Sequence, residues 1–286
     1  MDILTMEKNN IQEAAALAYG LNKNYSSSSA YCCHELESIL GDFSNNMATS
    51  FCCIKNHHIV GVLSCYVDYS RNTSDCSLLI DEVQTDYNDA AWSMFSAARN
   101  TFGEGMQYNF FFPKENSSCR EFLDGIGATK MINEYHLLLH HDKWNQKTST
   151  RIPHKLQETE YQFMAALHDG IFPDAYISGA DILSSLEEGT RRVYTITDNH
   201  KVLAYGVLRL KGRKEASAEV IGVREDSRHQ GYGRAILNHL CQIAFTELSA
   251  EEIDLIVDGD NEKAISLYLD TGFSIEHENN AYSYRQ

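Results

Sequence analysis

The segment Ser217 to Gly233, S-A-E-V-I-G-V-R-E-D-S-R-H-Q-G-Y-G, constrains the fold more than any other stretch of the chain. It begins as an apolar strand, turns through polar residues that include Arg228 and Gly231, and continues into an amphipathic helix. After such a turn, unpaired N–H groups point outward at the positive end of the helix dipole. Glycine also lets the backbone approach a ligand that a Cβ would block. The segment therefore predicts a binding site for a phosphorylated ligand.

Two faces are expected for the strand, because side chains alternate along it. The strand Ala218–Val223 would place Val220 and Gly222 on one face, and Glu219, Ile221 and Val223 on the other. The helix that follows carries apolar residues at i, i+4 spacing, which predicts a core-facing stripe. The stripe consists of Ala235, Ile236, Leu240, Ile243 and Ala244.

Basic side chains surround the turn and allow two interpretations. Arg224, Arg228, His229 and Arg234 form a local basic cluster in a chain with a net charge of −16. Such a cluster can be a solvated surface. It can also clamp a pyrophosphate, because arginine presents paired planar donors. The neighbouring glycines favour the clamp.

A second motif follows about thirty residues later. The strand Ile253–Val257 leads through D-G-D-N into the helix Asn261–Thr271, which Gly272 would end as the C′ residue before Phe273. Within the helix, Asn261, Ala264 and Tyr268 follow the pattern N-x-x-A-x-x-x-Y. Each also has a purely structural interpretation, as a helix cap, a small packing residue and a core aromatic.

The order of elements repeats along the chain, which predicts two similar domains. Two expected hairpins lie about 143 residues apart: strands 51–54 and 59–66 with the turn Lys55-Asn56-His57, and strands 192–197 and 202–208 with the turn Asp198-Asn199-His200. At an offset of 145, Asn116, Gly127 and Asp81 match Asn261, Gly272 and Asp226. The polar, proline-containing stretch 145–157 separates the halves. We expect one domain over 1–145, a linker over 146–157 and a second domain over 158–286.

The two halves differ where a site would lie. Arg228, Gly231 and Gly233 correspond to Val83, Asp86 and Asn88, so the first half lacks the arginine and gains a carboxylate that would repel phosphate. Tyr268 corresponds to Leu123, and Glu219 corresponds to Ser74. The first domain is therefore expected to keep the scaffold and to have lost the site.

These motifs resemble the GNAT superfamily of N-acetyltransferases. The resemblance rests on V-x-x-x-x-R-x-x-G-x-G (Val223 to Gly233) and N-x-x-A-x-x-L-Y-x-x-x-G-F (Asn261 to Phe273), and it covers 155–286 well and 1–145 weakly. It implies an α/β fold (an α+β mixed sheet) of two tandem GNAT-like domains. Each would be a mostly antiparallel sheet whose central parallel strand pair splays apart, flanked by helices. A dinucleotide-binding site fits less well, because a third glycine and a ribose-binding acid are missing.

The resemblance implies acetyl-CoA as cosubstrate. Its pantetheine arm would pair with free backbone groups of Ile221 to Val223, and its pyrophosphate would lie on the N–H groups of the turn. The residues expected to contact it are Ile221, Gly222, Val223, Arg228, His229, Gly231, Tyr232, Gly233, Arg234, Asn261 and Ala264.

The chemistry of acyl transfer to a primary amine suggests two catalytic residues. An amine that resembles lysine has a pKa near ~10.4 and must lose a proton before it attacks a thioester. Glu219 is the candidate base, directly or through water, although an edge salt bridge explains it equally well. Tyr268 is the candidate acid that protonates the departing thiolate. A main-chain N–H near Val223 would polarise the carbonyl.

The amino-acid composition narrows the classes of partner that the protein is expected to bind. Acids outnumber bases in both halves, which opposes nucleic-acid and anionic-membrane binding. The acidity fits a small-molecule or peptide amine acceptor that is itself cationic, and its alternative interpretation is that it only keeps the protein soluble. An acceptor wall is one interpretation of Phe172-Pro173-Asp174-Ala175-Tyr176, and a plain turn is the other. We expect no metal, since adjacent cysteines such as those in Cys32-Cys33-His34 rarely ligate one ion together. The eight cysteines lack C-x-x-C spacing and indicate reduced, mostly buried thiols in a cytoplasmic protein.

The sequence thus predicts an N-acetyltransferase with its active site in the second domain. The alternative is a non-catalytic acyl-CoA sensor or protein-interaction module on the same scaffold. Both would bind CoA, and only the enzyme would release it in the presence of an amine.

Overall fold

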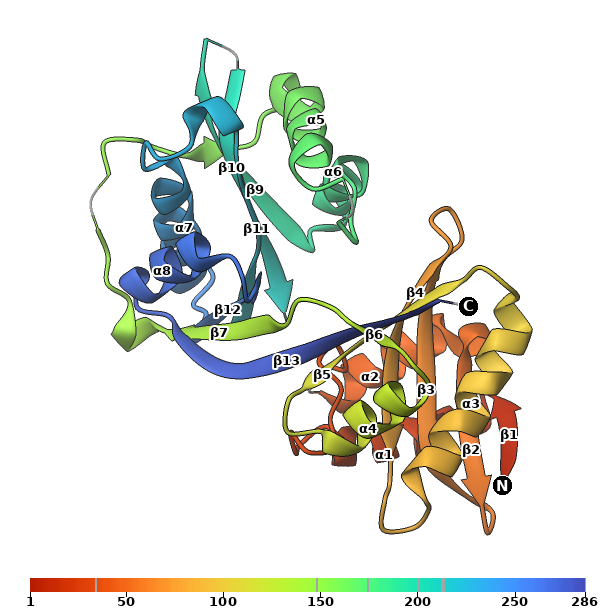
Figure 1. Cartoon of the computed structure of the whole chain (residues 1–286). Helices are drawn as coiled ribbons and strands as arrows, with labels where there is room; N and C mark the ends of the chain where they lie inside the picture. The colour runs from red at the N-terminus through yellow and green to blue at the C-terminus, as the bar shows by residue number, and fades with distance from the viewer. Residues whose placement is uncertain (34, 148, 174, 200, 212–213, 286) are drawn as a thin grey trace. The chain divides into compact units, whose positions relative to one another are not determined.

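The computed structural model of the chain describes every residue except 34, 148, 174, 200, 212–213 and 286 (Figure 1). His34 of the rejected metal candidate, Asp174 of the proposed acceptor wall and His200 of the expected hairpin turn lie outside the described residues. The chain divides into two compact units, Met1–Glu134 with His277–Gln286, and Tyr135–Glu276. Within the described residues, no helix combines the length and apolar character needed to cross a bilayer.

The first unit is a sheet covered by helices on both faces. Its strands run in the order β1-β2-β3-β4-β5-β13, with β6 beside β13, and β4 and β5 are parallel. Its elements are β1 (Asp2–Thr5), α1 (Ile11–Leu21), α2 (Leu36–Asn45), β2 (Ser50–Lys55), β3 (His58–Asp68), β4 (Thr73–Ile80), α3 (Tyr87–Phe102), β5 (Gln107–Pro113), α4 (Ser117–Gly125) and β6 (Thr129–Lys130).

The second unit repeats this plan, with strands in the order β7-β12-β11-β10-β9-β8 and a parallel pair formed by β11 and β12. Its elements are β7 (Glu134–His140), β8 (His154–Lys155), α5 (Tyr161–Ile171), α6 (Gly179–Glu188), β9 (Arg191–Asp198), β10 (Lys201–Lys211), β11 (Glu215–Val223), α7 (Tyr232–Gln242), β12 (Glu252–Asp258), α8 (Glu262–Thr271) and the start of β13 (Ser274–Arg285). A turn of π-helix, Ile243–Glu247, extends α7.

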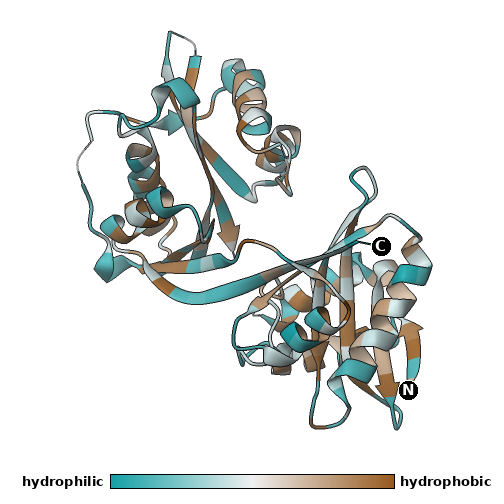
Figure 2. Ribbon diagram, in the orientation of Figure 1, coloured by the Kyte–Doolittle hydropathy of each residue, from teal (hydrophilic) through white to brown (hydrophobic). Residues whose placement is uncertain are grey.

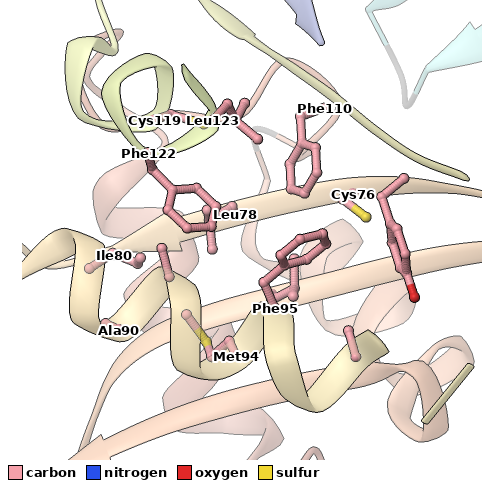
Figure 3. Close-up of a cluster of buried hydrophobic side chains, with 14 of the residues drawn as sticks. Cys76, Leu78, Ile80, Ala90, Met94, Phe95, Phe110, Cys119, Phe122 and Leu123 are labelled. Carbon is pink, nitrogen blue, oxygen red and sulfur yellow. The ribbon is translucent and has the colours of Figure 1, made fainter. Parts of the chain in front are cut away.

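Each sheet has a hydrophobic core on both faces. In the first unit, α3 and α4 cover one core, where the Phe95 ring meets Phe110 and Phe122 edge-on at centroid distances of 5.7 and 6.2 Å (Figure 3). In the second, α5 and α6 cover one face and α7 and α8 the other (Figure 1). The helices carry both brown and teal residues in Figure 2, as amphipathic helices do. The predicted stripe from Ala235 to Ala244 is buried, so that prediction is confirmed.

The local sequence predictions are confirmed at most of the described positions. Both hairpins form: β2 with β3, and β9 with β10. The strand expected at Ile253–Val257 is β12, and the helix expected from Asn261 is α8, with Gly272 in the left-handed region after it. Seven of the eight cysteines are buried.

The bounds of the two units differ from the domain boundaries expected from the sequence, because the two repeats exchange a strand. The strand β7 follows the first repeat in the chain, yet it pairs with β12 in the second unit. In return, Asn279–Arg285 of β13 pairs with β5 in the first unit. The two exchanged strands, 134–140 and 279–285, are again 145 residues apart. The expected linker 146–157 therefore lies inside the second unit, between β7 and α5.

Candidate active site

The start of α7 presents a row of unbonded backbone donors. The first N–H to bond back into the helix is that of Ala235, which donates to Gly231 O at 3.0 Å. Among the described residues, the N–H groups of 229–234 donate to no acceptor in the protein. Because these groups lie at the positive end of α7, they can hold an anion.

Left-handed backbone shapes this turn. His229 has φ 61° and Gly231, the residue before α7, has φ 84°. A Cβ on Gly231 would meet nothing within 4 Å, so its backbone angle, and not crowding, favours glycine. At Gly233 a Cβ would lie 3.6 Å from Val223 Cγ2, an ordinary contact. The neighbouring protein atoms thus leave room for a Cβ at Gly233.

The basic cluster is present, but acids neutralise part of it. Arg224 is paired with Asp226, with Nε and Oδ1 2.7 Å apart, and this contact holds the pKa of Asp226 at about 2. Arg234 Nη2 lies 3.1 Å from Asp270 Oδ2. Within the part of the chain that the structure describes, Arg228 donates only to the main-chain oxygen of Val223, at 3.3 Å. Arg228 is therefore the arginine of this cluster whose charge stays available to a ligand.

A cavity of about 380 Å³ borders the turn on the side of the β9–β10 hairpin. Its lining residues are Asp198, Asn199, Lys201, Leu203, Asp226, Ser227, Gln230 and Tyr232. Two carboxylates against one lysine make it unsuitable for a diphosphate. The anion-binding potential lies in the N–H groups at 229–234.

The strands β11 and β12 separate next to this turn. Their parallel ladder joins Glu215, Ala216 and Ser217 to Glu252, Ile253 and Asp254. In the described chain, residues 218–223 have no partner on β12, although they remain paired with β10 on their other side. The expected splay of the central parallel pair is confirmed, and it leaves the backbone edge of Ile221 to Val223 free.

A β-bulge at Glu219 breaks the alternation expected for β11. Ala218 pairs with Leu208 and Val220 pairs with Val207, so Glu219 is the extra residue. As a result Ala216, Ala218, Ile221 and Val223 all pack on the α7 side. The expectation that Glu219 shares a face with Ile221 and Val223 is wrong, because the bulge shifts the register between them.

The Glu219 carboxylate is held in a salt bridge. Arg191 Nε and Nη2 donate to its two oxygens at 2.5 and 2.8 Å, and the Tyr176 hydroxyl donates to Oε1. Only 6% of the Glu219 side chain is exposed. Burial and the neighbouring Glu219 charge raise the pKa of Tyr176. This geometry supplies the salt bridge that was one interpretation of Glu219.

Gly222 has a packing role on the opposite face. A Cβ there would lie 2.1 Å from Cε1 of Tyr205, a fully buried residue on β10. The Tyr205 hydroxyl bonds to His168 Nδ1 at 2.7 Å, and His168 Nε2 donates to Ile177 O at 2.8 Å. His168, Tyr205 and Arg191 escaped the sequence analysis, because nothing local marks contacts between residues so far apart in the chain.

The helix α8 carries the second motif. Asn261 caps it by accepting the N–H of Ala264 at 3.2 Å, so its structural interpretation is confirmed. The Tyr268 ring lies 6.0 Å from that of Phe273. Burial raises the pKa of Tyr268 to about 12, and its hydroxyl has no hydrogen-bond partner among the described residues. Tyr268 therefore keeps its proton at neutral pH and can donate it.

The corresponding place in the first unit is built differently. Asp86, which matches Gly231, caps α3 by accepting the N–H of Asp89 at 3.0 Å. Val83, in the place of Arg228, is 96% exposed, and Leu123, in the place of Tyr268, is fully buried. The carboxylate expected at this helix start is present, and it accepts from one of the backbone donors that an anion would need, the N–H of Asp89.

Comparison with known proteins relates the second unit to one family. Residues 140–273 match the model of the acetyltransferase (GNAT) family. A GCN5-related N-acetyltransferase from Sphaerobacter thermophilus has a TM-score of 0.79 at 11% identity, covering 99% of this chain and 95% of that one. A tandem GNAT protein from the clavulanic acid biosynthesis pathway has a TM-score of 0.73 at 12% identity, covering 99% and 98%. The predicted tandem GNAT fold is thus confirmed.

A curated relative matches a shorter stretch. Mycothiol acetyltransferase from Propionibacterium freudenreichii subsp. shermanii is 39% identical over 64 residues, which are 22% of this chain. The chain covers only 20% of the length of that relative.

Proposed function

We propose that the second unit transfers an acetyl group from acetyl-CoA to a primary amine. The observation that carries this proposal is the row of unbonded N–H groups at 229–234, beside the point where β11 and β12 separate. The family match over 140–273 and the name of the curated relative support acetyl transfer as the class of reaction.

The free edge of β11 and the start of α7 would bind the cosubstrate. The pantetheine arm would pair with Ile221 to Val223 as an added strand, and the pyrophosphate would accept from the N–H groups of 229–234. Arg228 would contribute its charge. The remaining cosubstrate contacts that we propose are His229, Tyr232, Gly233, Arg234, Asn261 and Ala264.

The acyl transfer moves two protons from the acceptor nitrogen as well as the acetyl group. The ammonium form of the acceptor loses a first proton, its nitrogen attacks the thioester carbon, and the C–S bond breaks to release the thiolate. The nitrogen loses its second proton as the amide forms, and this proton would restore the Tyr268 hydroxyl after it has protonated the thiolate. Glu219 would take the first proton through a water, because Arg191 and Tyr176 use three of its roughly four acceptor positions and one is left. A main-chain N–H near Val223 would stabilise the oxyanion, and the Tyr268 hydroxyl would protonate the thiolate.

A non-catalytic CoA sensor is the second candidate, and the tight pairing of Glu219 with Arg191 is the observation that favours it. A panel of amines distinguishes the two candidate functions, because only the enzyme would release CoA in the presence of an amine. We propose that the acceptor is a small molecule or a peptide, because the net charge of −16 disfavours nucleic acid and anionic membranes. The first unit would serve the fold and not the chemistry.

The variants Gly231→Asp and Gly231→Asn test the site. Both side chains have the same size and meet the same left-handed backbone, so they share any strain. Only Asp adds a negative charge, as Asp86 does in the first unit. We expect acetyl-CoA affinity to fall about 10- to 100-fold further in the Asp variant than in the Asn variant. Isothermal titration calorimetry measures the difference, and equal affinities would remove 229–234 from the site.

A further inference from the structure

Two arginines and one glutamate lie together on the face of the second sheet that α5 and α6 cover. Arg191 on β9 pairs directly with Arg209 on β10, and Arg209 pairs with Ser217 on β11. Residues that pair directly across neighbouring strands share a face. The bulged Glu219 joins this group by bonding to Arg191. The group lies where β11 leaves β12, so it borders the proposed site of acyl transfer.

The group carries a surplus positive charge. Arg191 neutralises Glu219 through two hydrogen bonds, and these two side chains are 13% and 6% exposed. Arg209 Nη1 is 3.7 Å from Glu219 Oε1, which is too long for a hydrogen bond. Its side chain is 48% exposed, and its guanidinium donates to no acceptor among the described residues. An arginine with free donors is thus held beside a neutralised pair.

A fixed aromatic wall stands next to these arginines. The residue Tyr176 is 64% exposed, and its hydroxyl donates to Glu219. The carbonyl of the following residue, Ile177, accepts a hydrogen bond from the fully buried His168, which also bonds to the Tyr205 hydroxyl. These contacts hold Tyr176 in a defined position at the surface, as a binding wall requires.

We propose that Arg209 binds a carboxylate of the acceptor, so that the acceptor is a primary amine that also carries a carboxylate, such as an amino acid. This inference rests on the proposed function and replaces the cationic acceptor expected from the net charge. The free guanidinium offers two parallel N–H groups, which match the two oxygens of a carboxylate. A second cationic group on the acceptor would meet the unneutralised charge of Arg209 and be repelled. The Tyr176 ring would cover the carbon chain between the amine and the carboxylate.

Arg209→Gln tests the proposal, and Arg192→Gln is its matched control. Arg192 lies next to Arg191 on β9, makes its ion pair with Glu247, and loses the same charge when replaced. The acceptors are glycine, β-alanine and 4-aminobutanoate, their primary amides, 3-aminopropyl phosphate and 1,4-diaminobutane. Steady-state CoA release gives kcat and KM for each. Calorimetry on protein saturated with CoA gives carboxylate affinity without turnover.

We expect at least one amino carboxylate to exceed its amide by about 10- to 100-fold in kcat/KM, mainly through KM. Arg209→Gln should abolish this preference by lowering kcat/KM more for the carboxylate than for its amide, whereas Arg192→Gln should retain it. Equal rates for carboxylate and amide, or a preference for the diamine or the phosphate, would overturn the proposal. Carboxylate binding that depends on Arg209 without any CoA release would refute the proposed function while supporting the carboxylate site.

Discussion

Replacing Gly222 with alanine is expected to destabilise the second unit by about 2–6 kcal/mol. The added Cβ would lie 2.1 Å from Cε1, 2.7 Å from Cζ and 2.9 Å from the hydroxyl oxygen of Tyr205. The ring has no space to yield, because Tyr205 is fully buried and its hydroxyl is bonded to His168 at 2.7 Å. Overpacking costs about 1–3 kcal/mol, and a lost buried hydrogen bond costs about 1–3 kcal/mol more.

Guanidinium unfolding, followed by circular dichroism and compared at equal m-value, measures this loss. Gly233→Ala is the control, because its Cβ would make only an ordinary contact 3.6 Å from Val223. We expect that control to be unchanged or up to about 1 kcal/mol more stable, since alanine favours a helix over glycine. In Gly222→Ala/Tyr205→Leu the two losses should be less than additive, because the smaller side chain leaves room for the Cβ. A Gly222→Ala protein within about 0.5 kcal/mol of wild type would show that the ring does not lie against β11.

Three further predictions concern the Tyr268 hydroxyl and the exchanged strands. Tyr268→Phe should lower kcat about 100-fold or more with little change in acetyl-CoA affinity, and wild-type turnover would exclude the tyrosine as the acid. Burial raises the pKa of Tyr268 to about 12, so the unfolded chain loses this proton at a lower pH than the folded chain does. The free energy of unfolding of the wild type should therefore fall between about pH 10 and 12. In Tyr268→Phe this fall should be smaller by up to about 3 kcal/mol, as measured by unfolding curves at alkaline pH. The fragments 1–145 and 158–286 should each fail to fold alone and should form a complex when co-expressed, and a stable monomeric 158–286 fragment in size-exclusion chromatography would contradict the role of strand exchange.

The parts of the fold that local sequence determines could be predicted. The hairpins, the glycine turn before α7 and the Asn261 cap of α8 depend on residues within a few positions of each other. The carboxylate at the start of α3 was also predictable, because Asp86 lies at the same place in the repeat as Gly231.

The parts that depend on distant pairings could not be predicted in this way. The bulge at Glu219 appears only when β11 is aligned with β10, and the partner Arg191 lies 28 residues away in the chain. The same holds for Tyr205, which explains Gly222 through a contact between neighbouring strands. Alternation alone therefore misplaced Glu219, since it assumes an uninterrupted register.

Strand exchange gives the first repeat a structural role in the second unit that does not depend on a site of its own. The sheet of the second unit takes β7 from the end of the first repeat, and β7 is the strand next to β12. His136 Nε2 on β7 lies 2.9 Å from Asp254 Oδ2 on β12, at the last residue that β12 pairs with β11. Without β7, an inner strand of the proposed catalytic unit would become an exposed edge where the cosubstrate gap begins. The first repeat therefore cannot lose residues 134–140 without disturbing the second unit, whereas Asp86 at the start of α3 leaves this strand exchange intact.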